Sequence, residues 1–345
     1  MNDKILFFSD VHIRETGSFL PWNQVVNGRG LTGEIENIMK GFKFISSQIV
    51  EHQPRLVIFA GDWHHTTDSI TTMSLYASGL CHSMILDACE EVGCEFWMFS
   101  GQHDIYSEIY NITSIGVFSR SCKYIPTEKI KDIDGFKIGI LPYLSCNELA
   151  LSTLSDMSCK VDLISTHLNF GGSVFESGKV SDSILSPKLG VPCVSGDIHR
   201  QGAYQDVTYC GSLYQNKFAQ DNTDHVGGVV LFDMNSKKIK SIPNTVSKHY
   251  VRVKDLKQVK KLDPDKVVLQ VVTSDDKEEV SNVCEDFEYM FIPRPTFEEE
   301  KEFDEDYVDT SLQTPKEIFR SYVEDDNPEA VKLFDRVMSG KRRDK

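Results

Sequence analysis

Short apolar runs alternate with longer amphipathic stretches along the first two-thirds of the chain. Five of the runs are almost entirely apolar and cover positions 5–9, 56–60, 96–100, 163–166 and 191–195. Runs of this kind, without polar alternation, are typical of strands that are buried on both faces of a sheet. We therefore predict five buried strands, and two more strands at 136–141 and 228–233.

Helical patterns lie between the first of these strands. Within residues 33–51 the apolar side chains recur every three to four positions, which is the period of a helix that covers a sheet. A second helix is predicted over 69–91, because Asp68-Ser69 provides an N-cap signal and Gly93 a stop signal. Strands that alternate with helices in this way indicate an α/β layered domain, to which we assign residues 1–240.

The hydrophobic pattern changes after residue 245. Strand-like runs at 250–253, 267–272 and 287–291 surround a helical stretch at 275–286, which predicts a small cap domain over 245–297. Residues 298–311 form an acidic run that is typical of a solvated linker. Two helices are predicted within 312–345, and the first opens with an N-cap and a proline at Thr314-Pro315. Their apolar side chains either dock on the parent domain or bind a partner protein.

Composition limits the class of protein. With 345 residues and 40% hydrophobic content, the chain can form one large packed domain and one or two smaller units. It has neither the basic start and apolar core of a signal peptide nor an apolar stretch near the roughly 18–20 residues that cross a bilayer. We expect a soluble, cytoplasmic protein without membrane contact. Nine cysteines without a C-x-x-C pair indicate reduced thiols rather than disulfides or a zinc knot.

The formal net charge of -15 excludes a generally basic surface that attracts phosphate groups. The exception is the stretch 248–261, which holds six basic residues against the single acid Asp255. This stretch either follows a nucleic-acid backbone or forms a solvated face. Any contact with nucleic acid is therefore expected to be local, or shared with a partner.

Each of the five buried strands ends at a residue that can bind a metal ion. In chain order these residues are Asp10-x-His12, Asp62, Gln102-His103-Asp104, His167 and Asp197-x-His199. Functional groups gather at the carboxyl ends of the strands in such sheets. Hydrolysis of a phosphate ester needs a nucleophile at neutral pH and a clamp for the developing charge, and two divalent ions about 3.5–4 Å apart supply both.

The set of side chains suits such a pair of ions. One carboxylate has to bridge the ions, and further nitrogen and oxygen ligands have to complete the coordination of each. The chain offers seven candidates, which are Asp10, His12, Asp62, Gln102, His167, Asp197 and His199. His103 is not needed as a ligand and can serve as a general acid that supplies a proton to the leaving oxygen. The sequence therefore predicts a two-metal phosphoesterase.

The five motifs in this order resemble those of the calcineurin-like metallophosphoesterases. Within that fold the chain is similar to the SbcD-type nuclease subunits of DNA double-strand-break repair, and its modest length is closer to phage-encoded versions. The narrower resemblance rests on Pro142-Tyr143, on His167-x-x-x-Gly171, on Tyr209-x-Gly211-Ser212, and on the cap with its terminal helices. It implies a four-layer β-sandwich flanked by helices, with a small α+β cap domain and C-terminal helices.

The resemblance implies a role for each site residue. It implies that metal 1 is held by Asp10, His12 and His199. It implies that Asp62 bridges the two ions and that His167 binds metal 2. It also implies that His103 protonates the leaving oxygen and that Asp104 orients His103 or its loop.

These roles imply an enzyme that hydrolyses phosphodiester bonds in DNA, as an exonuclease or endonuclease in end processing, recombination or repair. The ions are expected to be Mn²⁺, with Mg²⁺ as the alternative. The resemblance also implies an SbcC-like coiled-coil ATPase partner that docks on the C-terminal helices, and it allows a homodimer. If a phage encodes the chain, the expected location is the host cytoplasm.

Two positions depart from the family's pattern. The third motif of the family carries asparagine where this chain has Gln102, and the last motif has histidine where this chain has Asp197. Both positions belong to metal 2, and metal–ligand distances tolerate only about 0.2 Å. Because one side chain is longer and the other shorter, we expect metal 2 to shift toward residue 197 or to be lost. The added carboxylate also favours Mn²⁺ or Mg²⁺ over softer ions.

Four further residues are weaker candidates for substrate contact. His64 and His65 follow the bridging aspartate, Arg200 follows the last motif, and Ser212 ends the Tyr209 motif. Two other functions stay open. One is a phosphodiesterase of the same fold that acts on small molecules or nucleotides, and the other is a catalytically impaired scaffold whose metal 2 site has decayed.

Overall fold

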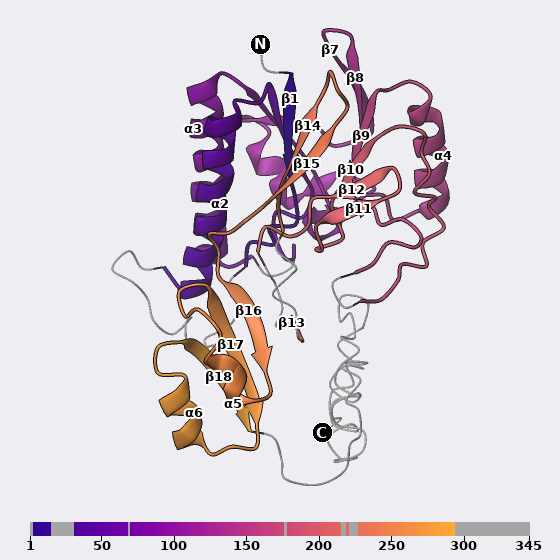
Figure 1. Ribbon diagram of the computed structural model, residues 1–345. Helices are drawn as coiled ribbons and strands as arrows, with labels where there is room; N and C mark the ends of the chain where they lie inside the picture. Colours follow the sequence, from indigo (N-terminus) through magenta and orange to yellow (C-terminus); the bar gives the residue numbers. More distant parts are fainter. Residues whose placement is uncertain are drawn as a thin grey trace, which may run out of the picture. The chain divides into compact units, whose positions relative to one another are not determined.

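The computed structural model describes residues 3–14, 31–67, 70–175, 178–214, 219–220 and 227–293, which belong to one compact unit (Figure 1). The acidic linker and the two C-terminal helices predicted for 298–345 lie outside the described residues. No helix in the described part of the chain is long and apolar enough to cross a membrane.

The first of two six-stranded sheets has the strand order β15-β14-β1-β2-β3-β6. Its strands are β1 (Lys4–Phe8), β2 (Leu56–Ala60), β3 (Glu95–Phe99), β6 (Lys123–Tyr124), β14 (Gly228–Asp233) and β15 (Ile239–Pro243). The strands β1, β2, β3 and β6 are parallel, whereas β14 runs antiparallel to both β1 and β15.

The second sheet has the order β11-β12-β10-β9-β8-β7. Its strands are β7 (Lys129–Ile133), β8 (Phe136–Leu141), β9 (Leu163–Thr166), β10 (Cys193–Ser195), β11 (Gly202–Tyr204) and β12 (Val207–Tyr209). The four central strands are parallel, and the two edge strands are antiparallel to their neighbours.

Alternation along β1 shows how the sheets are packed. Successive side chains of a strand point to opposite faces. Phe7 packs between the two sheets with Ile58 and Ile140, whereas Phe8 lies on the outer face of the first sheet. That outer face is covered by α2 (Gly33–His52) and α3 (Thr72–Val92). The outer face of the second sheet is covered by α4 (Asn147–Ser158).

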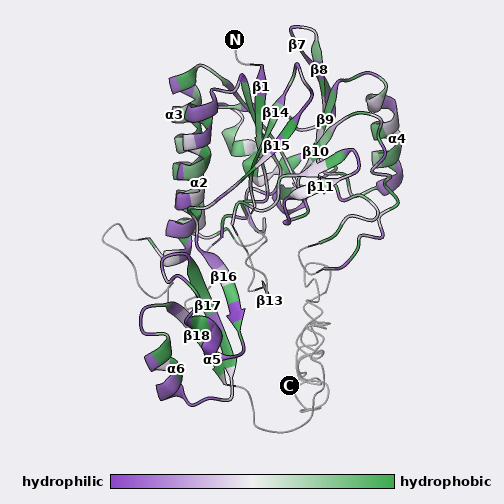
Figure 2. Cartoon of the chain, viewed as in Figure 1, coloured by the Kyte–Doolittle hydropathy of each residue, from purple (hydrophilic) through white to green (hydrophobic). Residues whose placement is uncertain are grey.

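Figure 2 shows mainly hydrophobic residues along the central strands and mixed residues along α2, α3 and α4. Strands that are covered on both faces need apolar residues at every position, and helices at the surface need only one apolar side. The predicted α/β class is confirmed. The layering specific to the metallophosphoesterases stays a prediction.

The five motif-bearing strands are divided between the two sheets, with β1, β2 and β3 in the first and β9 and β10 in the second. Two details of the expected elements need correction. The run 191–195 forms a strand only over Cys193–Ser195. The helix predicted from residue 69 begins at Thr72, where Thr71 accepts a hydrogen bond from the Ser74 N–H, and it ends at Gly93 as expected. The expected cap Asp68-Ser69 lies outside the described residues.

A four-stranded parallel sheet follows the two large sheets. It contains β13 (Ala219–Gln220), β16 (His249–Val253), β17 (Val267–Thr273) and β18 (Glu288–Pro293), with α5 (Leu256–Val259) and α6 (Lys277–Val283) in the connections. We call this small sheet and its helices the cap. The helix predicted over 275–286 is shorter than expected. Asn37 on α2 joins the cap to the large sheets, because its Oδ1 accepts a hydrogen bond from the Lys248 N–H at 2.6 Å.

Candidate metal centre

The carboxyl ends of five strands, three from the first sheet and two from the second, bring the predicted ligands together. Asp10 and His12 follow β1, and Asp62 follows β2. A short 3₁₀ helix, η1 (Gln102–Asp104), follows β3. His167 follows β9, and Asp197 and His199 follow β10. The register of parallel strands places these ends at one edge of each sheet, and the two edges meet at the site.

Five side-chain nitrogen and oxygen atoms lie close together at this centre, and Asp197 is in neither of the two groups that they form. The Nε2 atoms of His12 and His199 are 3.0 Å apart, and the His12 Nε2 atom lies 3.6 Å from Asp62 Oδ2. His167 Nε2 lies 3.2 Å from Asp62 Oδ2 and 3.8 Å from Asp10 Oδ1. These atoms form two groups that can each hold an ion, Asp10 with His12 and His199, and Asp10 with Asp62 and His167.

Asp62 and Asp10 both lie between the two groups. Asp62 Oδ2 faces a histidine of each group, which is the position expected of a bridging carboxylate. Asp10 takes part in both groups as well, and the sequence did not predict this. Its Oδ1 atom accepts a hydrogen bond from the Asp197 N–H at 3.0 Å, which ties the last motif to the first.

The backbone at the site adopts a conformation that most residues avoid. Asp10, His12, Asp62 and Asp197 have φ angles of 52°, 43°, 62° and 77°, which lie in the left-handed region. Such residues cost of order 1–3 kcal/mol each and cluster where function requires a particular side-chain direction. Asp197 shares this backbone conformation with three of the proposed ligands.

Glycines make room for the ligands. A Cβ atom at Gly61 or Gly196 would collide with the His167 ring, and one at Gly101 would collide with the Asp62 carboxylate. The His167 ring is therefore enclosed by backbone on two sides. Its Nδ1–H donates a hydrogen bond to the carbonyl oxygen of Ala60 at 2.6 Å, so Nε2 is the ring nitrogen that faces Asp62 and Asp10. Burial lowers the pKa of His167, but these two carboxylates outweigh it and raise the pKa well above its usual value, so a metal ion at Nε2 would displace a proton.

Two buried polar atoms at the centre test whether a metal ion fits. Asp62 Oδ2 and His167 Nε2 are fully buried, and neither takes part in a hydrogen bond among the described residues. Leaving a polar atom in this state costs about 1–3 kcal/mol, and more for a charged group. A divalent cation between them would provide the missing interaction. The donor set of carboxylate oxygens and imidazole nitrogens suits divalent ions, so the residues present fit a metal centre.

Burial and mutual interaction set the charges of the site. Burial raises the pKa of Asp10, although the positive charges of His167 and His199 oppose it. Burial also tends to raise the pKa of Asp62, but the neighbouring His167 and His103 have the larger effect, so the pKa of this carboxyl is lowered. Burial, with His199 and His103 beside it, holds the pKa of His12 well below its usual value. A neutral His12 has a free lone pair, as a metal ligand requires.

Asp104 contacts the loop that carries His103, as the orienting role expected for it requires. Its carboxylate is fully buried and accepts hydrogen bonds from the backbone N–H groups of Asp62, Trp63, His64 and Gly101 at 2.8–3.1 Å. It therefore fixes the loop that carries Asp62 together with its own loop. Asp104 is a positioning residue and not a catalytic one, because it cannot reach a substrate.

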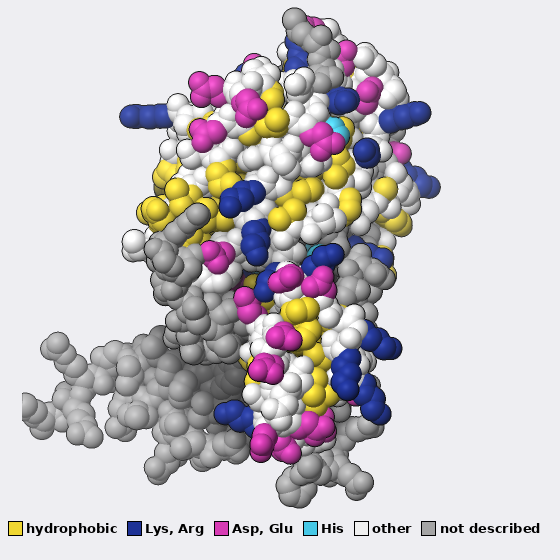
Figure 3. All heavy atoms as spheres, turned by 60° about the vertical axis from the view of Figure 1, so that its left-hand side comes forward, with side chains coloured by type: hydrophobic (Ala, Val, Ile, Leu, Met, Phe, Trp, Pro, Cys, Tyr) yellow, Lys and Arg dark blue, Asp and Glu magenta, His cyan; other side chains and the backbone are white. Residues whose placement is uncertain are grey.

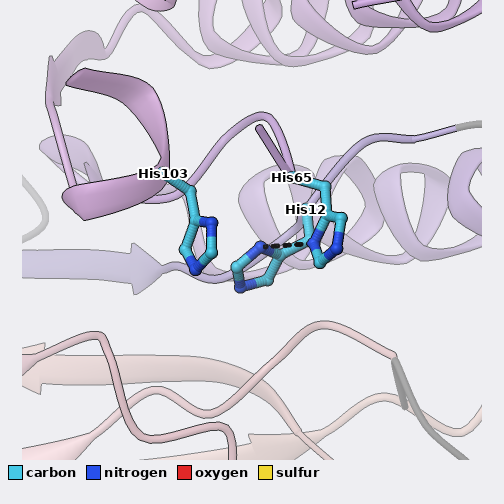
Figure 4. Close-up of side chains that lie close together, drawn as sticks. All are labelled: His12, His65 and His103. Carbon is cyan, nitrogen blue, oxygen red and sulfur yellow. Dashed lines mark hydrogen bonds between the residues drawn. The ribbon is translucent and has the colours of Figure 1, made fainter. Parts of the chain in front are cut away.

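Three imidazole rings form one side of the site (Figure 4). The ring of His103 lies 4.9 Å from that of His12 and stacks on His65 at 5.6 Å, centroid to centroid. The Nδ1 atoms of His65 and His12 are 3.5 Å apart. Arg14, which the sequence did not single out, lies with Nη1 3.3 Å from His65 Nε2 and pairs with the buried Glu34 at 3.1 Å. His65 is thus part of the site.

Two of the weaker candidates have structural roles. His64 is buried, and its ring nitrogens lie 2.8 Å from Ser114 Oγ and 3.0 Å from Ser78 Oγ, away from the ligands. Ser212 is buried as well, and its Oγ–H donates to the carbonyl oxygen of Asp10 at 2.8 Å. Both side chains therefore have contacts within the protein, and substrate contact by either residue stays a prediction. Arg200 is exposed beside His199, and Gln102 is half-buried at the start of η1.

Comparisons with known proteins show only distant likeness. No family model and no curated protein matches the chain. Among solved structures, an archaeal phosphodiesterase is 10% identical with a TM-score of 0.35, over 70% of this chain and 99% of that one. A Thermotoga maritima protein is 14% identical with a TM-score of 0.30, over 70% of this chain and 97% of that one.

A third solved structure belongs to a different class of enzyme. The glutamine-dependent NAD+ synthetase from Acinetobacter baumannii is 11% identical with a TM-score of 0.33, over 84% of this chain and 64% of that one. At these scores a likeness carries no argument about function. What the chain can do has to be argued from its own side chains, which form an Asp/His cluster that fits divalent metal ions within an α/β fold.

Proposed function

We propose that the protein is a metal-dependent phosphodiesterase that cleaves DNA, a nuclease of the SbcD type. One observation carries the proposal. The buried atoms Asp62 Oδ2 and His167 Nε2 have no hydrogen bond, and they lie where two groups of carboxylates and imidazoles meet. Two adjacent ion sites that share carboxylates are the arrangement used for in-line displacement at phosphorus.

The proposed ligands divide between two ions. Asp10, His12 and His199 hold metal 1, and His167 holds metal 2. Asp62 lies between them, and Asp197 and Gln102 complete the second ion. When bound, the ions supply a nucleophile from water at neutral pH and neutralise the charge that develops on the phosphoryl oxygens. We propose Mn²⁺, because the carboxylate ligands suit it.

His103 is the proposed donor of the proton to the leaving oxygen. Its backbone N–H donates to Asp62 Oδ1 at 2.9 Å, so the main chain is fixed to the centre of the site. Its ring is only partly buried and borders His12, a proposed ligand. A general acid needs this combination of a fixed position and access to the substrate.

Two surface features support DNA as the substrate. The first is a set of exposed lysines on and beside α5, which are Lys257, Lys260 and Lys261. In Figure 3 Lys and Arg side chains lie along one edge of the cap. Lys248 does not add to this set, because it pairs with Glu288 at 3.3 Å. Clustered lysines of this kind can neutralise backbone phosphates in an otherwise acidic protein.

The second feature is the hairpin that directly follows η1. It consists of β4 (Ile105–Ser107) and β5 (Ile112–Thr113), and it carries Tyr106 and Tyr110, which are 69% and 77% exposed. Tyr106 is three residues from His103, so their Cα atoms are at most about 11 Å apart. Exposed aromatic rings near a cleavage site can stack on the bases of an unpaired strand. A small phosphodiester would not need them.

We further propose that an SbcC-like ATPase partner docks on the C-terminal segment 312–345. The apolar side chains of that segment at helical spacing support this. A homodimer remains part of the same proposal.

The test uses purified protein with Mn²⁺ and two substrates, end-labelled linear duplex DNA and bis(p-nitrophenyl) phosphate. His103→Ala is expected to lower nucleotide release about 10²–10⁴-fold, the usual contribution of a general acid. The loss should be smaller for the p-nitrophenyl ester, whose leaving group needs no proton. His52→Ala, at the end of α2, is the control and should keep full activity.

Each result has a definite meaning. Cleavage of the small ester without cleavage of DNA would replace the nuclease by a small-molecule phosphodiesterase. Cleavage of neither substrate, with Mn²⁺ or Mg²⁺, would favour the impaired scaffold and overturn the proposal.

A further inference from the structure

Asp197 stands where the family pattern would place a longer imidazole, and its carboxylate is held from one side. Its Oδ2 atom accepts a hydrogen bond from Asn169 Nδ2 at 2.7 Å. The residue is only 9% exposed, and its charge is one of those that raise the pKa of His167. Because Oδ2 is engaged by Asn169, the direction of the other oxygen, Oδ1, is fixed as well.

Asn169 itself cannot turn freely. Its Oδ1 atom accepts a hydrogen bond from Ser181 Oγ at 2.9 Å. A carboxylate can only accept and the serine hydroxyl donates here, so the amide has one favourable orientation. The backbone on either side is fixed too, because the Leu168 N–H donates to Ser195 Oγ and the Phe170 N–H donates to the Tyr209 hydroxyl, both at 3.1 Å.

The serine that fixes the amide lies in an ordered turn. Ser181 is buried, its N–H donates to the carbonyl oxygen of Ser173 at 2.7 Å, and its carbonyl accepts from the Gly172 N–H at 2.9 Å. A chain of contacts therefore runs from this turn through Ser181 and Asn169 to Asp197. Groups that orient ligands in this way are typically worth 10–100-fold in metal affinity.

We propose that Asn169 is a positioning residue that aims Asp197 at metal 2 and so compensates for the shorter side chain at this position. The inference rests on the proposed function, because it requires Asp197 to serve a metal ion. It also explains how a carboxylate can replace an imidazole here without loss of the second ion. The sequence held a weak signal for it, since Asn169 is the second residue after His167.

The test measures binding of Mn²⁺ to the full-length protein by calorimetry and by electron paramagnetic resonance. Wild type is expected to bind two ions. Asn169→Ala should weaken one of them 10–100-fold and leave the other unchanged. The melting temperature in EDTA is measured as well, because a purely structural role would lower it and leave the ratio of the two Mn²⁺ affinities unchanged. Asn147→Ala, an exposed asparagine on α4, is the matched control and should bind both ions normally.

Ser181→Ala provides a second route to the same answer if Asn169→Ala does not fold. It leaves the Asn169 amide free to turn, so a weaker loss of several-fold is expected at the same ion. Unchanged affinity for both ions in these variants would overturn the role of Asn169 and leave the proposed function standing. Failure of wild type to bind two ions would overturn both.

Discussion

The conservative change Asp104→Asn separates the positioning role of this residue from a catalytic one. Its two carboxylate oxygens divide four backbone donors between them. Oδ2 accepts from Asp62 N at 2.8 Å and from Gly101 N at 3.1 Å, and Oδ1 accepts from Trp63 N at 3.0 Å and from His64 N at 3.1 Å. Either orientation of an asparagine amide turns an NH₂ group toward two of these N–H groups.

The size of the effect follows from that count. Burial and the neighbouring Asp62 raise the pKa of Asp104 to about 7, so the carboxylate is fully charged only above that pH. At a pH of about 8.5 a hydrogen bond to this charged acceptor contributes about 1.5–3 kcal/mol, and two lost bonds should lower the free energy of unfolding by about 3–6 kcal/mol. The total for a native protein is about 5–15 kcal/mol, so the change is large in proportion. It should be present in metal-free protein, because the four donors belong to the backbone.

Urea unfolding in EDTA measures this change, since chelation removes any stabilisation by bound metal. The midpoint should fall while the slope stays the same. Asp156→Asn is the control: Asp156 is exposed on α4, where it pairs with Lys160 at 2.6 Å, so its loss should stay within about 0.5 kcal/mol. A loss below 1 kcal/mol for Asp104→Asn would refute the reasoning.

Two further predictions concern the site and the core. Gly101→Ala should abolish hydrolysis in a kinetic assay, because the new Cβ collides with the Asp62 carboxylate. Gly79→Ala in α3 meets open space and should raise stability by about 0.5–1 kcal/mol, as measured by the urea midpoint. Equal effects of the two changes would contradict this. Burial lowers the pKa of His82 to about 4, where its ring stacks on Phe118 at 4.1 Å. Its contribution to stability is therefore complete above the unfolded pKa near 6.5 and declines as the pH falls toward 4. Replacing it in His82→Phe should reduce the loss of stability between pH 7 and pH 5 by about 1 kcal/mol, and an unchanged pH dependence would speak against a neutral His82.

Local patterns of apolar and polar residues were enough to place the strands and the main helices. Strands such as β2 and β14 match their predicted bounds, because a strand covered on both faces must be apolar at every position. The start of α3 was missed, since Thr71 and Ser69 have the same capping chemistry and only the path of the chain selects between them. The ligand candidates were found for a similar reason. Asp10, Asp62 and His167 follow buried strands, where polar residues of these types have few other uses.

Which strands pair, and which side chains enter the site, depends on tertiary contacts. Whether β9 lies beside β2 or in a second sheet depends on contacts between distant segments, which local periodicity does not contain. For the same reason, sequence could not distinguish His64, which faces Ser78 in the interior, from its neighbour His65, which faces His12. The hydrogen bond from Asn169 to Asp197 joins the segments that follow β9 and β10, and it exists because the carboxyl ends of these strands lie side by side.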